Sequence, residues 1–336
     1  MTTAPLHAAT PPRPSRLQGA RDNVWLRFLV RRLLSLVLVL VVLAMVVFVM
    51  VHTIPGDPVQ QSLGLNADPE IVAQIRADNG FDKPLLEQFT AYTTDVLTGD
   101  LGKSFRTGED VSAIIGQRLG TSLELAVAAL LIVLFVSIPL GILMGALTRE
   151  GRHRKIELGF TSVTSVFGAV PDFLSGTVLA FLFAVQFQIF PVAGAGSPDQ
   201  LVLPALALSI GPTMTLSRIV RVETLNVLAQ DYIRTARSKR LPSARIYARH
   251  ALPNVVTAAL TVGGLIFASI VGGAVAVEVV FARPGLGTAL VEAVIAKDYR
   301  VVQGITLMLG VTVIIVNATI DILLAIIDPR SLARHS

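Results

Sequence analysis

The chain has 336 residues, of which 53% are hydrophobic and 15% are charged, and its mean hydropathy is +0.68. This balance is typical of an integral membrane protein and excludes an ordinary pair of soluble domains. The net charge of +5 fits either nucleic-acid binding or membrane topology, so the positions of the basic residues must decide, and the absence of cysteine excludes disulfides and thiolate chemistry.

In the N-terminal region the sequence indicates a tail followed by a first transmembrane helix that is not cleaved off as a signal peptide. Residues 1–22 are rich in Pro, Ala and Thr and lack apolar periodicity, so we predict a disordered cytoplasmic tail over residues 1–26. Residues 33–51 are apolar except for Ser35, and no small-residue cleavage site follows them. We therefore predict that residues 27–54 form the first transmembrane helix and not a cleaved signal.

Five further apolar stretches are long enough to cross a membrane, because a spanning helix needs roughly 20 residues for a hydrocarbon core of about 30 Å. They are 125–147, 158–190 with Asp172 inside, 201–216 with Pro204 and Pro212, 255–277, and 301–327 with Asp321 inside. We predict an all-α integral membrane protein of about six transmembrane helices, with a five-helix core over residues 114–330.

The basic residues predict the orientation of these spans. An N-terminus in the cytoplasm places 20 of the 28 Lys and Arg residues on the cytoplasmic side, in the N-terminal segment, in 149–155, in 218–249 and in the C-terminal tail, residues 331–336 with Arg330 before them. Positive residues are retained preferentially in the cytoplasm. Both termini are therefore expected to be cytoplasmic.

Residues 55–113 are polar and are expected to form a small extracytoplasmic subdomain. Asp68 can cap a helix that begins at Pro69 and ends at Asn79 and Gly80. Pro84 can open a second helix.

A basic cytoplasmic loop is the most distinctive polar feature of the chain. From 231 to 250 it carries six Lys or Arg residues against one Asp, and its apolar residues have helical spacing up to Pro242. Ser243 can cap a second short helix that runs through His250. Charge alone leaves two readings open, a loop that lies on anionic membrane lipid and a docking element for another protein.

The loop resembles, residue by residue, the coupling loop of ABC importer permeases. The matching segments read Asp231-Tyr232-Ile233-Arg234-Thr235-Ala236-Arg237-Ser238-Lys239 and Arg249-His250-Ala251-Leu252-Pro253. In that family the loop inserts a short helix into the ATPase subunit. Its motif is Glu-Ala-Ala, then three residues before a Gly, then nine residues before an Ile, and after one more residue Leu-Pro. Arg234, Thr235 and Ala236 take the first three places here, and Leu252 and Pro253 take the last two.

Arg240 stands where the family has its glycine. Glycine permits a left-handed turn that arginine adopts at a cost of about 1 kcal/mol. The sequence therefore does not decide how the chain turns between the two short helices of the loop. Further motifs resemble the peptide and nickel branch of these permeases over residues 27–330. They are Ile54-Pro55-Gly56-Asp57-Pro58, Gly99-Asp100-Leu101-Gly102-Lys103-Ser104, Glu278-Val279-Val280-Phe281, Pro284-Gly285-Leu286-Gly287 and Asp328-Pro329-Arg330.

The resemblance implies a type I ABC importer permease fold with a cytoplasmic coupling loop over residues 222–254. The ATPase-coupling residues that we assign are Asp231, Tyr232, Arg234, Thr235, Ala236, Arg237, Lys239, Arg240, Leu252 and Pro253. The implied partners are a second, homologous permease in a heterodimer, two cytoplasmic ATP-binding subunits and an extracytoplasmic substrate-binding protein. All of them would act at the inner or plasma membrane of a prokaryote.

This chain is not expected to hydrolyse ATP itself. Gly102-Lys103-Ser104 is not a P-loop, because that motif needs a glycine where Leu97 stands. The energy must then come from partner subunits. We expect no catalytic residue, no metal site, no cofactor and no nucleic-acid partner, because the five histidines lack metal-ligand spacing and no catalytic grouping is recognisable.

Three acidic residues in or beside the spans are candidates for the pathway or its gate. Asp172 either lines the pathway and attracts a substrate amino group or packs against a neighbouring helix with hydrogen bonds. Asp321 shares a helix face with Asn317, which favours a polar contact between spans over a transport role. The resemblance places Glu278 near the external gate, whereas Glu124 is expected simply to reach water.

Two other functions remain open from the residues alone. An ion-coupled secondary transporter would use Asp172 and Asp321 as proton or ion sites. An intramembrane enzyme would need a catalytic constellation that the sequence does not display. The substrate stays open among dipeptides, oligopeptides, nickel complexes and glutathione.

Overall fold

The structure is a computed structural model that describes residues 17–53, 58–64, 68–78 and 80–327. Residues 1–16 of the predicted tail, the segment 54–57 and the closing motif Asp328-Pro329-Arg330 lie outside the described residues. Residues 17–26, for which we also predicted disorder, belong to a helix. Within them the chain is helical apart from turns and one isolated β-bridge between Lys103 and Asp110. The predicted all-α class is confirmed.

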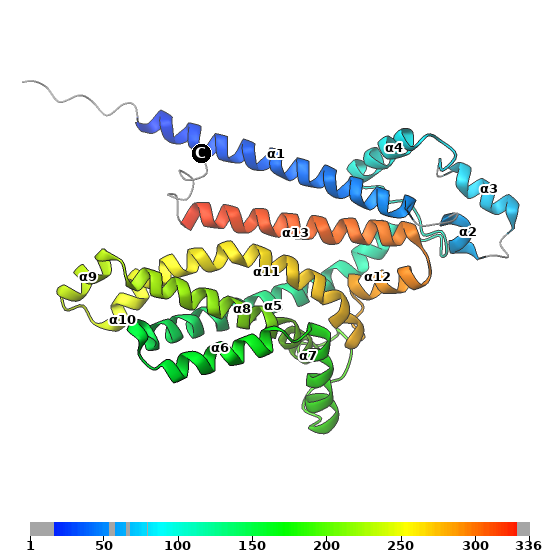
Figure 1. Cartoon of the computed structure of the whole chain (residues 1–336). Coiled ribbons are helices and arrows are strands. Elements are labelled where there is room, and N and C mark those ends of the chain that lie inside the picture. The colour runs from blue at the N-terminus through cyan, green and yellow to red at the C-terminus, as the bar shows by residue number, and fades with distance from the viewer. Residues whose placement is uncertain (1–16, 54–57, 65–67, 79, 328–336) are drawn as a thin grey trace, which may run out of the picture.

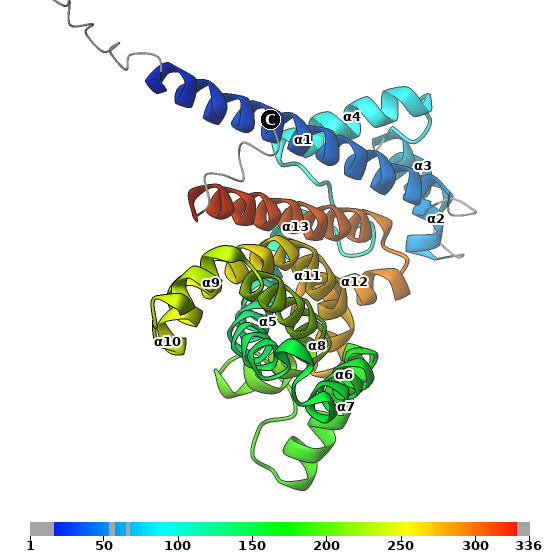
Figure 2. The same ribbon diagram turned by 60° about the vertical axis from the view of Figure 1, so that its left-hand side comes forward.

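The helices follow one another along the chain (Figures 1 and 2). The α-helices are α1 (Leu17–His52), α2 (Pro58–Leu63), α3 (Pro69–Asp78), α4 (Leu85–Thr98), α5 (Val111–Leu147), α6 (Arg154–Gly168), α7 (Asp172–Leu179), α8 (Asp199–Leu228), α9 (Asp231–Ser238), α10 (Ser243–Ile246), α11 (Leu252–Val280), α12 (Leu286–Ile295) and α13 (Tyr299–Ile327). A 3-10 turn η1 (Arg149–Gly151) and two π-helical turns, η2 (Ala180–Gln186) and η3 (Tyr247–Ala251), lie between them.

The described residues contain five helices that are long and apolar enough to cross a membrane, and a bent pair that could form a sixth span. All five begin earlier than the stretches that we predicted, and two of them do so by ten residues or more. Helix α1 starts at Leu17, ahead of the boundary predicted at residue 27, and α5 starts at Val111, ahead of 125. Hydropathy detects only the part of a helix that lies in lipid, so it misses polar turns that extend beyond it.

The third predicted span is not one straight helix. Helix α6 ends at Gly168, α7 starts at Asp172, and the pair is bent by 93°. Pro171 lies at the break as the N-cap of α7; it has no backbone N–H to donate and disfavours the α conformation for the residue before it. The segment from α7 to η2 therefore projects away from the bundle (Figure 1).

The fourth span keeps two prolines inside a continuous helix. Helix α8 has 30 residues, with Pro204 and Pro212 within it. The Gln200 carbonyl, which loses its helical partner because Pro204 has no N–H, accepts a hydrogen bond from Arg283 at 3.1 Å. Helix α8 also approaches α5 closely at small residues. A Cβ on Gly141 of α5 would lie 2.5 Å from a methyl group of Val220 on α8.

The predicted outer subdomain consists of three short helices beside the end of α1. Helix α3 begins at Pro69 and ends at Asp78, as the sequence predicts, and α4 begins directly after Pro84. Asp68 accepts a hydrogen bond from the Glu70 N–H at 3.0 Å as the predicted cap. The rings of Phe48 on α1 and Phe89 on α4 pack edge to face, with centroids 5.3 Å apart. The Tyr299 hydroxyl, at the start of α13, donates a hydrogen bond to Gln61 of α2 at 2.9 Å. The subdomain is thus fastened to both α1 and α13.

The two ends of the bundle are different. One end collects the beginning of α1, the pair α9–α10 and the end of α13, whereas α2 to α4 and α12 lie at the opposite end (Figure 1). This arrangement agrees with the predicted topology, in which the basic loop lies on the side of both termini.

Candidate functional site

The basic loop forms a two-helix elbow at one end of the bundle. Helix α9 buries Ile233 and Ala236, which are 0% and 6% exposed, and turns its charged residues outward. Pro242 ends the turn and caps α10, so Ser243 is the first helical residue and not the cap that we predicted. The second helix reaches Ile246 and continues as the π-helical turn η3, so it does not run as one α-helix through His250.

Arg240 takes the left-handed conformation that the family's glycine would supply. Its φ is 55°, and α9 ends in a Schellman motif: Arg240 N–H donates to the Arg237 carbonyl at 2.8 Å, and Leu241 N–H donates to the Ala236 carbonyl at 3.3 Å. These two bonds satisfy carbonyl groups that the helix end would otherwise leave unpaired. The elbow therefore has the bend that a glycine would favour.

Arg240→Gly should stabilise this turn by about 1 kcal/mol, because glycine adopts positive φ without the steric cost that arginine carries. Hydrogen exchange at the Arg237 to Leu241 amides should become about fivefold slower for that gain. Arg240→Ala is the matched control, since it removes the same charge and keeps the Cβ. Equal exchange rates in the two variants would show that charge and not backbone conformation governs the turn.

Polar contacts fasten the elbow to the next span. The Asn254 amide on α11 donates to the Tyr232 hydroxyl at 3.1 Å and to the His250 carbonyl at 2.9 Å. Burial, together with the negative charge of Glu223, raises the pKa of Tyr232. Leu252 and Pro253 open α11, where a proline in the first turn is tolerated because those N–H groups have no helical partner.

The elbow and the spans share one hydrophobic core. Ile233, Ala236 and Ile246 belong to the same cluster of buried side chains as residues of α5, α8 and α11. At the base of the elbow, Arg221 of α8 donates to Glu157 of α6 at 2.6 Å and to Thr148 after α5 at 3.0 Å. A displacement of the elbow must therefore be transmitted to these spans, because a close-packed interior transmits strain.

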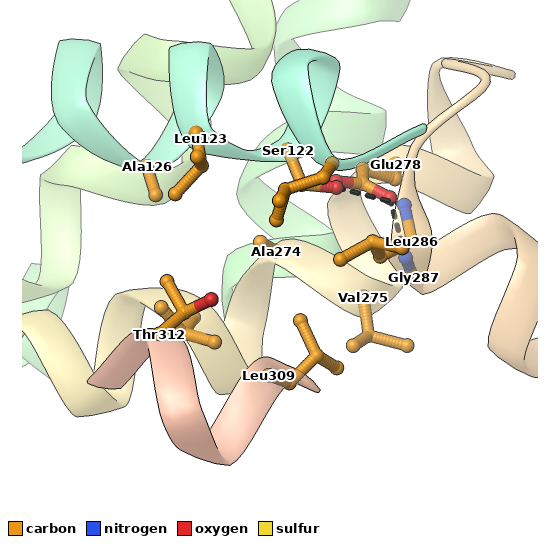
Figure 3. A pocket seen from close by; sticks show the side chains of 12 residues that line it. Ser122, Leu123, Ala126, Ala274, Val275, Glu278, Leu286, Gly287, Leu309 and Thr312 are labelled. Carbon is orange, nitrogen blue, oxygen red and sulfur yellow. Dashed lines mark hydrogen bonds between the residues drawn. The ribbon is translucent and has the colours of Figure 1, made fainter. Parts of the chain in front are cut away.

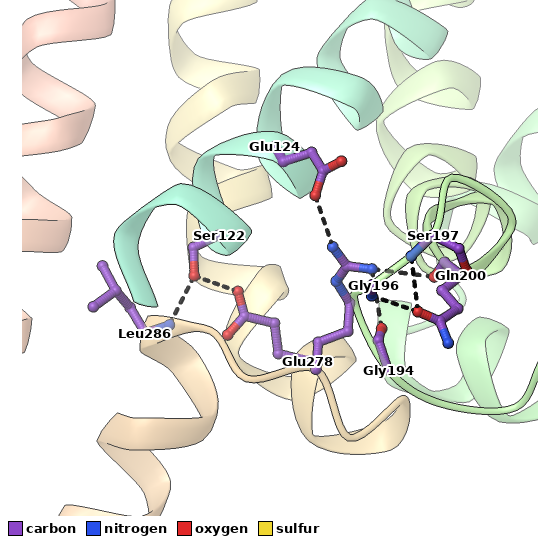
Figure 4. Close-up of polar contacts among 9 residues, drawn as sticks. Ser122, Glu124, Gly194, Gly196, Ser197, Gln200, Glu278 and Leu286 are labelled. Atoms are coloured by element: carbon purple, nitrogen blue, oxygen red, sulfur yellow. Dashed lines mark hydrogen bonds and ion pairs between the residues drawn. The ribbon is translucent and has the colours of Figure 1, made fainter. Parts of the chain in front are cut away.

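Glu278 is buried at the opposite end of the bundle, where it caps α12 from outside that helix. Its carboxylate accepts hydrogen bonds from the Ser122 hydroxyl at 2.6 Å and from the Gly287 and Thr288 N–H groups at 2.8 and 3.3 Å. Ser122 in turn accepts the Leu286 N–H at 2.8 Å (Figure 4). The first three N–H groups of α12 are thus satisfied by side chains of α5 and α11.

The glycines of the Pro284-Gly285-Leu286-Gly287 motif make room for this cap. A Cβ on Gly285 would overlap the Glu278 carboxylate, and a Cβ on Gly287 would lie 2.5 Å from the Val275 Cα. A cavity of about 20 Å³ adjoins the cap, between Leu123, Ala274, Leu309 and Thr312 (Figure 3). It has room for about one water molecule.

Arg283 is a functional candidate that our sequence reasoning missed. Its side chain is 1% exposed and donates to the Gly194 and Gln200 carbonyls at 3.2 and 3.1 Å and to Glu124 at 3.2 Å. Glu124, which we expected simply to reach water, is therefore also an ion-pair partner. The signal in the sequence was a lone arginine beside an apolar span on the side where few basic residues lie.

Arg283 joins the loop between η2 and α8 to the outer ends of α5 and α11. The same loop is closed on itself by Gln200, whose side-chain oxygen accepts the Gly196 and Ser197 N–H groups at 2.6 and 3.1 Å (Figure 4). Together, Glu278 and Arg283 hold the outer end of the bundle through contacts between segments far apart in the sequence.

Asp172 begins α7 at the bend of the third span. Its carboxylate lies against Gly211 of α8 and Gly273 of α11, two positions where the absence of a side chain makes room for it. It is partly exposed and accepts no hydrogen bond from the described residues. The carboxylate thus packs against neighbouring helices, as the alternative expects, but without the hydrogen bonds of that alternative among the described residues.

Asp321 forms an ion pair with Arg32, which links α13 to α1. Asn317, one turn earlier on α13, lies against Gly264 of α11. The structure does not bring Asp172, Glu278 and Asp321 together in one site: each lies at a different helix contact. Within the described residues no group of three or more His, Asp or Glu side chains is arranged to hold a metal ion.

Both halves of the chain match models of known protein families. Residues 137–332 match the family model of the binding-protein-dependent transport system inner membrane component, and residues 25–126 match the N-terminal model of such membrane components. A relative from Brucella suis biovar 1, by its name a peptide transport system permease protein, is 36% identical over 310 residues, which cover 90% of this chain and 98% of the relative.

A second relative, the glutathione transport system permease protein of Salmonella paratyphi A, is 34% identical over 305 residues, with 90% of this chain and 98% of the relative covered. The described spans agree with a multi-pass membrane protein. The chain belongs to the family of inner membrane components of binding-protein-dependent transport systems, the permease subunits of ABC importers.

Proposed function

We propose that this chain forms half of the translocation pathway of an ATP-driven importer of small peptides. The observation that carries this proposal is the elbow, which exposes a basic outer face while its buried face belongs to the core of the spans. A second homologous permease would complete the pathway, two cytoplasmic ATPases would contact the elbow, and an extracytoplasmic binding protein would deliver the substrate. Both termini would lie in the cytoplasm.

Peptides are the proposed substrate class because the two relatives described are named for peptides and for glutathione, which is itself a small peptide. Asp172 supports this choice, since its carboxylate lies at a helix bend between two glycines without a described partner. A peptide amino terminus is an ammonium group that such a carboxylate can bind. We assign Asp321 instead to helix packing, because Arg32 neutralises it.

In the proposed cycle, closure of the ATPase pair moves the elbow. The spans α5, α8 and α11 follow, because their side chains share a core with Ile233 and Ala236. At the far end, the contacts of Glu278 and Arg283 hold α12 and the loop before α8 against the spans. Rearrangement of these outer contacts would open or close access from outside.

Reconstitution tests this function directly. Proteoliposomes that contain the complete complex, with loaded binding protein on the outer side, should accumulate labelled dipeptide only when ATP is present on the ATPase side. Uptake that persists after ATPase inactivation and collapses with the proton gradient would support the ion-coupled alternative and contradict the proposal.

Asp172→Asn should weaken transport of peptides that carry a free amino terminus. The substitution keeps the size of the side chain and removes its charge, so loss of about 1.5 kcal/mol from a charge-assisted contact should raise KM about tenfold. N-acetylated peptides should be unaffected. Asp199→Asn, at an exposed acid at the start of α8, is the matched control. An equal change for both kinds of peptide would remove Asp172 from substrate recognition.

A further inference from the structure

A polar cavity of about 330 Å³ lies beside the elbow, between the turn that joins α5 to α6 and the start of α10. Its wall includes Arg149, Arg152 and Arg237, together with Glu150 and Ser243. The end of α5, the start of α6 and helix α10 meet at this end of the bundle (Figure 1). Of the residues in its wall, only Arg237 belongs to the coupling residues that we assign, and the proposed transport cycle gives the cavity itself no role.

The cavity carries an excess of positive charge. Arg149 is paired, since its Nε donates to Glu150 at 2.9 Å. The guanidinium groups of Arg152 and Arg237 form no hydrogen bond or ion pair with any residue that the structure describes. The pKa of Glu150 is lowered, first by the hydrogen bond and charge of Arg149 and then by the charges of Arg152 and Arg237, so all three guanidinium groups act at one place. Two positive charges remain uncompensated there.

The backbone of the turn is strained next to these side chains. Glu150, Gly151 and His153 have φ values of 58°, 74° and 53°, all in the left-handed region. For the two residues that are not glycine this conformation costs about 1 kcal/mol each. Such strain persists only where surrounding contacts hold it, and it clusters at binding sites.

The cavity also adjoins the end of a helix that is long and apolar enough to cross a membrane. Helix α5 crosses the membrane and ends at Leu147, and Ala146 in its last turn lines the cavity. Leu143 lies three residues earlier, on the same face of α5, and is 52% exposed. An amphiphile could therefore place a charged head in the cavity and an acyl chain along Leu143.

We propose that this cavity binds a phosphate group, and that its source is an anionic phospholipid of the adjoining leaflet. Guanidinium groups bind phosphate oxygens in bidentate pairs, and Arg152 and Arg237 are the two unpaired guanidinium groups of the wall. A soluble phosphate ester has the same head-group chemistry and is the other possible source. The inference goes beyond the transport function and does not depend on which substrate is carried.

The test measures lipid retained by the complete complex in nanodiscs that contain phosphatidylcholine and phosphatidylglycerol. Native mass spectrometry after release should find phosphatidylglycerol on the wild-type complex. Arg152→Gln should reduce that retention about fivefold, the factor expected for one basic side chain at a membrane surface. Arg154→Gln is the matched control, because Arg154 is an exposed neighbour outside the cavity wall; it should retain lipid as the wild type does.

A second arm adds millimolar glycerol phosphate to the same samples. If glycerol phosphate binding depends on Arg152 while lipid retention does not, the cavity binds a phosphate group, but this group comes from a soluble ester and not from a phospholipid. Equal lipid loss in Arg152→Gln and Arg154→Gln would reduce the effect to general surface charge and overturn the proposal. So would unchanged lipid retention in Arg152→Gln together with no binding of glycerol phosphate. None of these outcomes depends on uptake.

Discussion

Replacing Glu278 with alanine should lower the free energy of unfolding by about 3–5 kcal/mol, the cost of removing one partner from a buried charged hydrogen-bond network. The carboxylate is 1% exposed and accepts three hydrogen bonds. Without it, the Gly287 and Thr288 N–H groups at the start of α12 lose their acceptor. Thermal unfolding of the purified complex in detergent would measure this loss of stability. It should be followed with a fluorescent dye that does not react with thiols, because the chain has no cysteine.

Two variants separate the cap from a general effect of charge. Glu292→Ala removes an exposed acid from the same helix, and because its pairing with Arg118 spans 3.5 Å at the surface it should cost less than about 1 kcal/mol. Glu278→Gln keeps the shape and one acceptor oxygen, so its cost should lie between the other two. If Glu278→Ala unfolds at the same temperature as Glu292→Ala, the capping role of Glu278 is wrong.

The apolar spans and the elbow could be predicted because their signals are local. Hydropathy over a window of residues detects a spanning helix, and the helix stop at Pro242 acts on its immediate neighbours. Arg240 is instructive: the sequence identifies a position that needs positive φ, and the structure has φ of 55° there with arginine in place. The sequence left the bend of the elbow open, and the structure shows that Arg240 adopts the conformation that a glycine would favour.

The polar contacts could not be predicted, because each joins segments that the sequence separates widely. Ser122 and Glu278 are 156 residues apart, and Glu124 and Arg283 are 159 apart. The 93° bend at Pro171 also depends on what surrounds the break, since a proline within α8 leaves that helix continuous. A residue type indicates that a partner or a break is needed, but tertiary packing decides which one forms.

Loosening the elbow from the spans should uncouple ATP hydrolysis from transport. Ile233 is 0% exposed and belongs to the shared core, so Ile233→Ala should weaken that contact by about 2–5 kcal/mol. The charged outer face of α9, which we propose meets the ATPase, is left intact. Hydrolysis stimulated by the loaded binding protein should therefore persist, while peptide uptake falls at least about tenfold for a loss of this size.

The matched control makes the same chemical change at an exposed site. Ile156 on α6 is 41% exposed, so Ile156→Ala opens no cavity in the core. Ile233→Val, which removes a single methyl group, provides a milder variant that should lie between the wild type and Ile233→Ala.

The ratio of peptide taken up to ATP hydrolysed, measured in proteoliposomes for these variants, tests most directly whether the elbow is the mechanical link to the spans. The predicted result is a ratio that falls at least about tenfold in Ile233→Ala, falls less in Ile233→Val and stays at the wild-type value in Ile156→Ala. A ratio that is unchanged in Ile233→Ala, with uptake and hydrolysis lowered together or not at all, would contradict it.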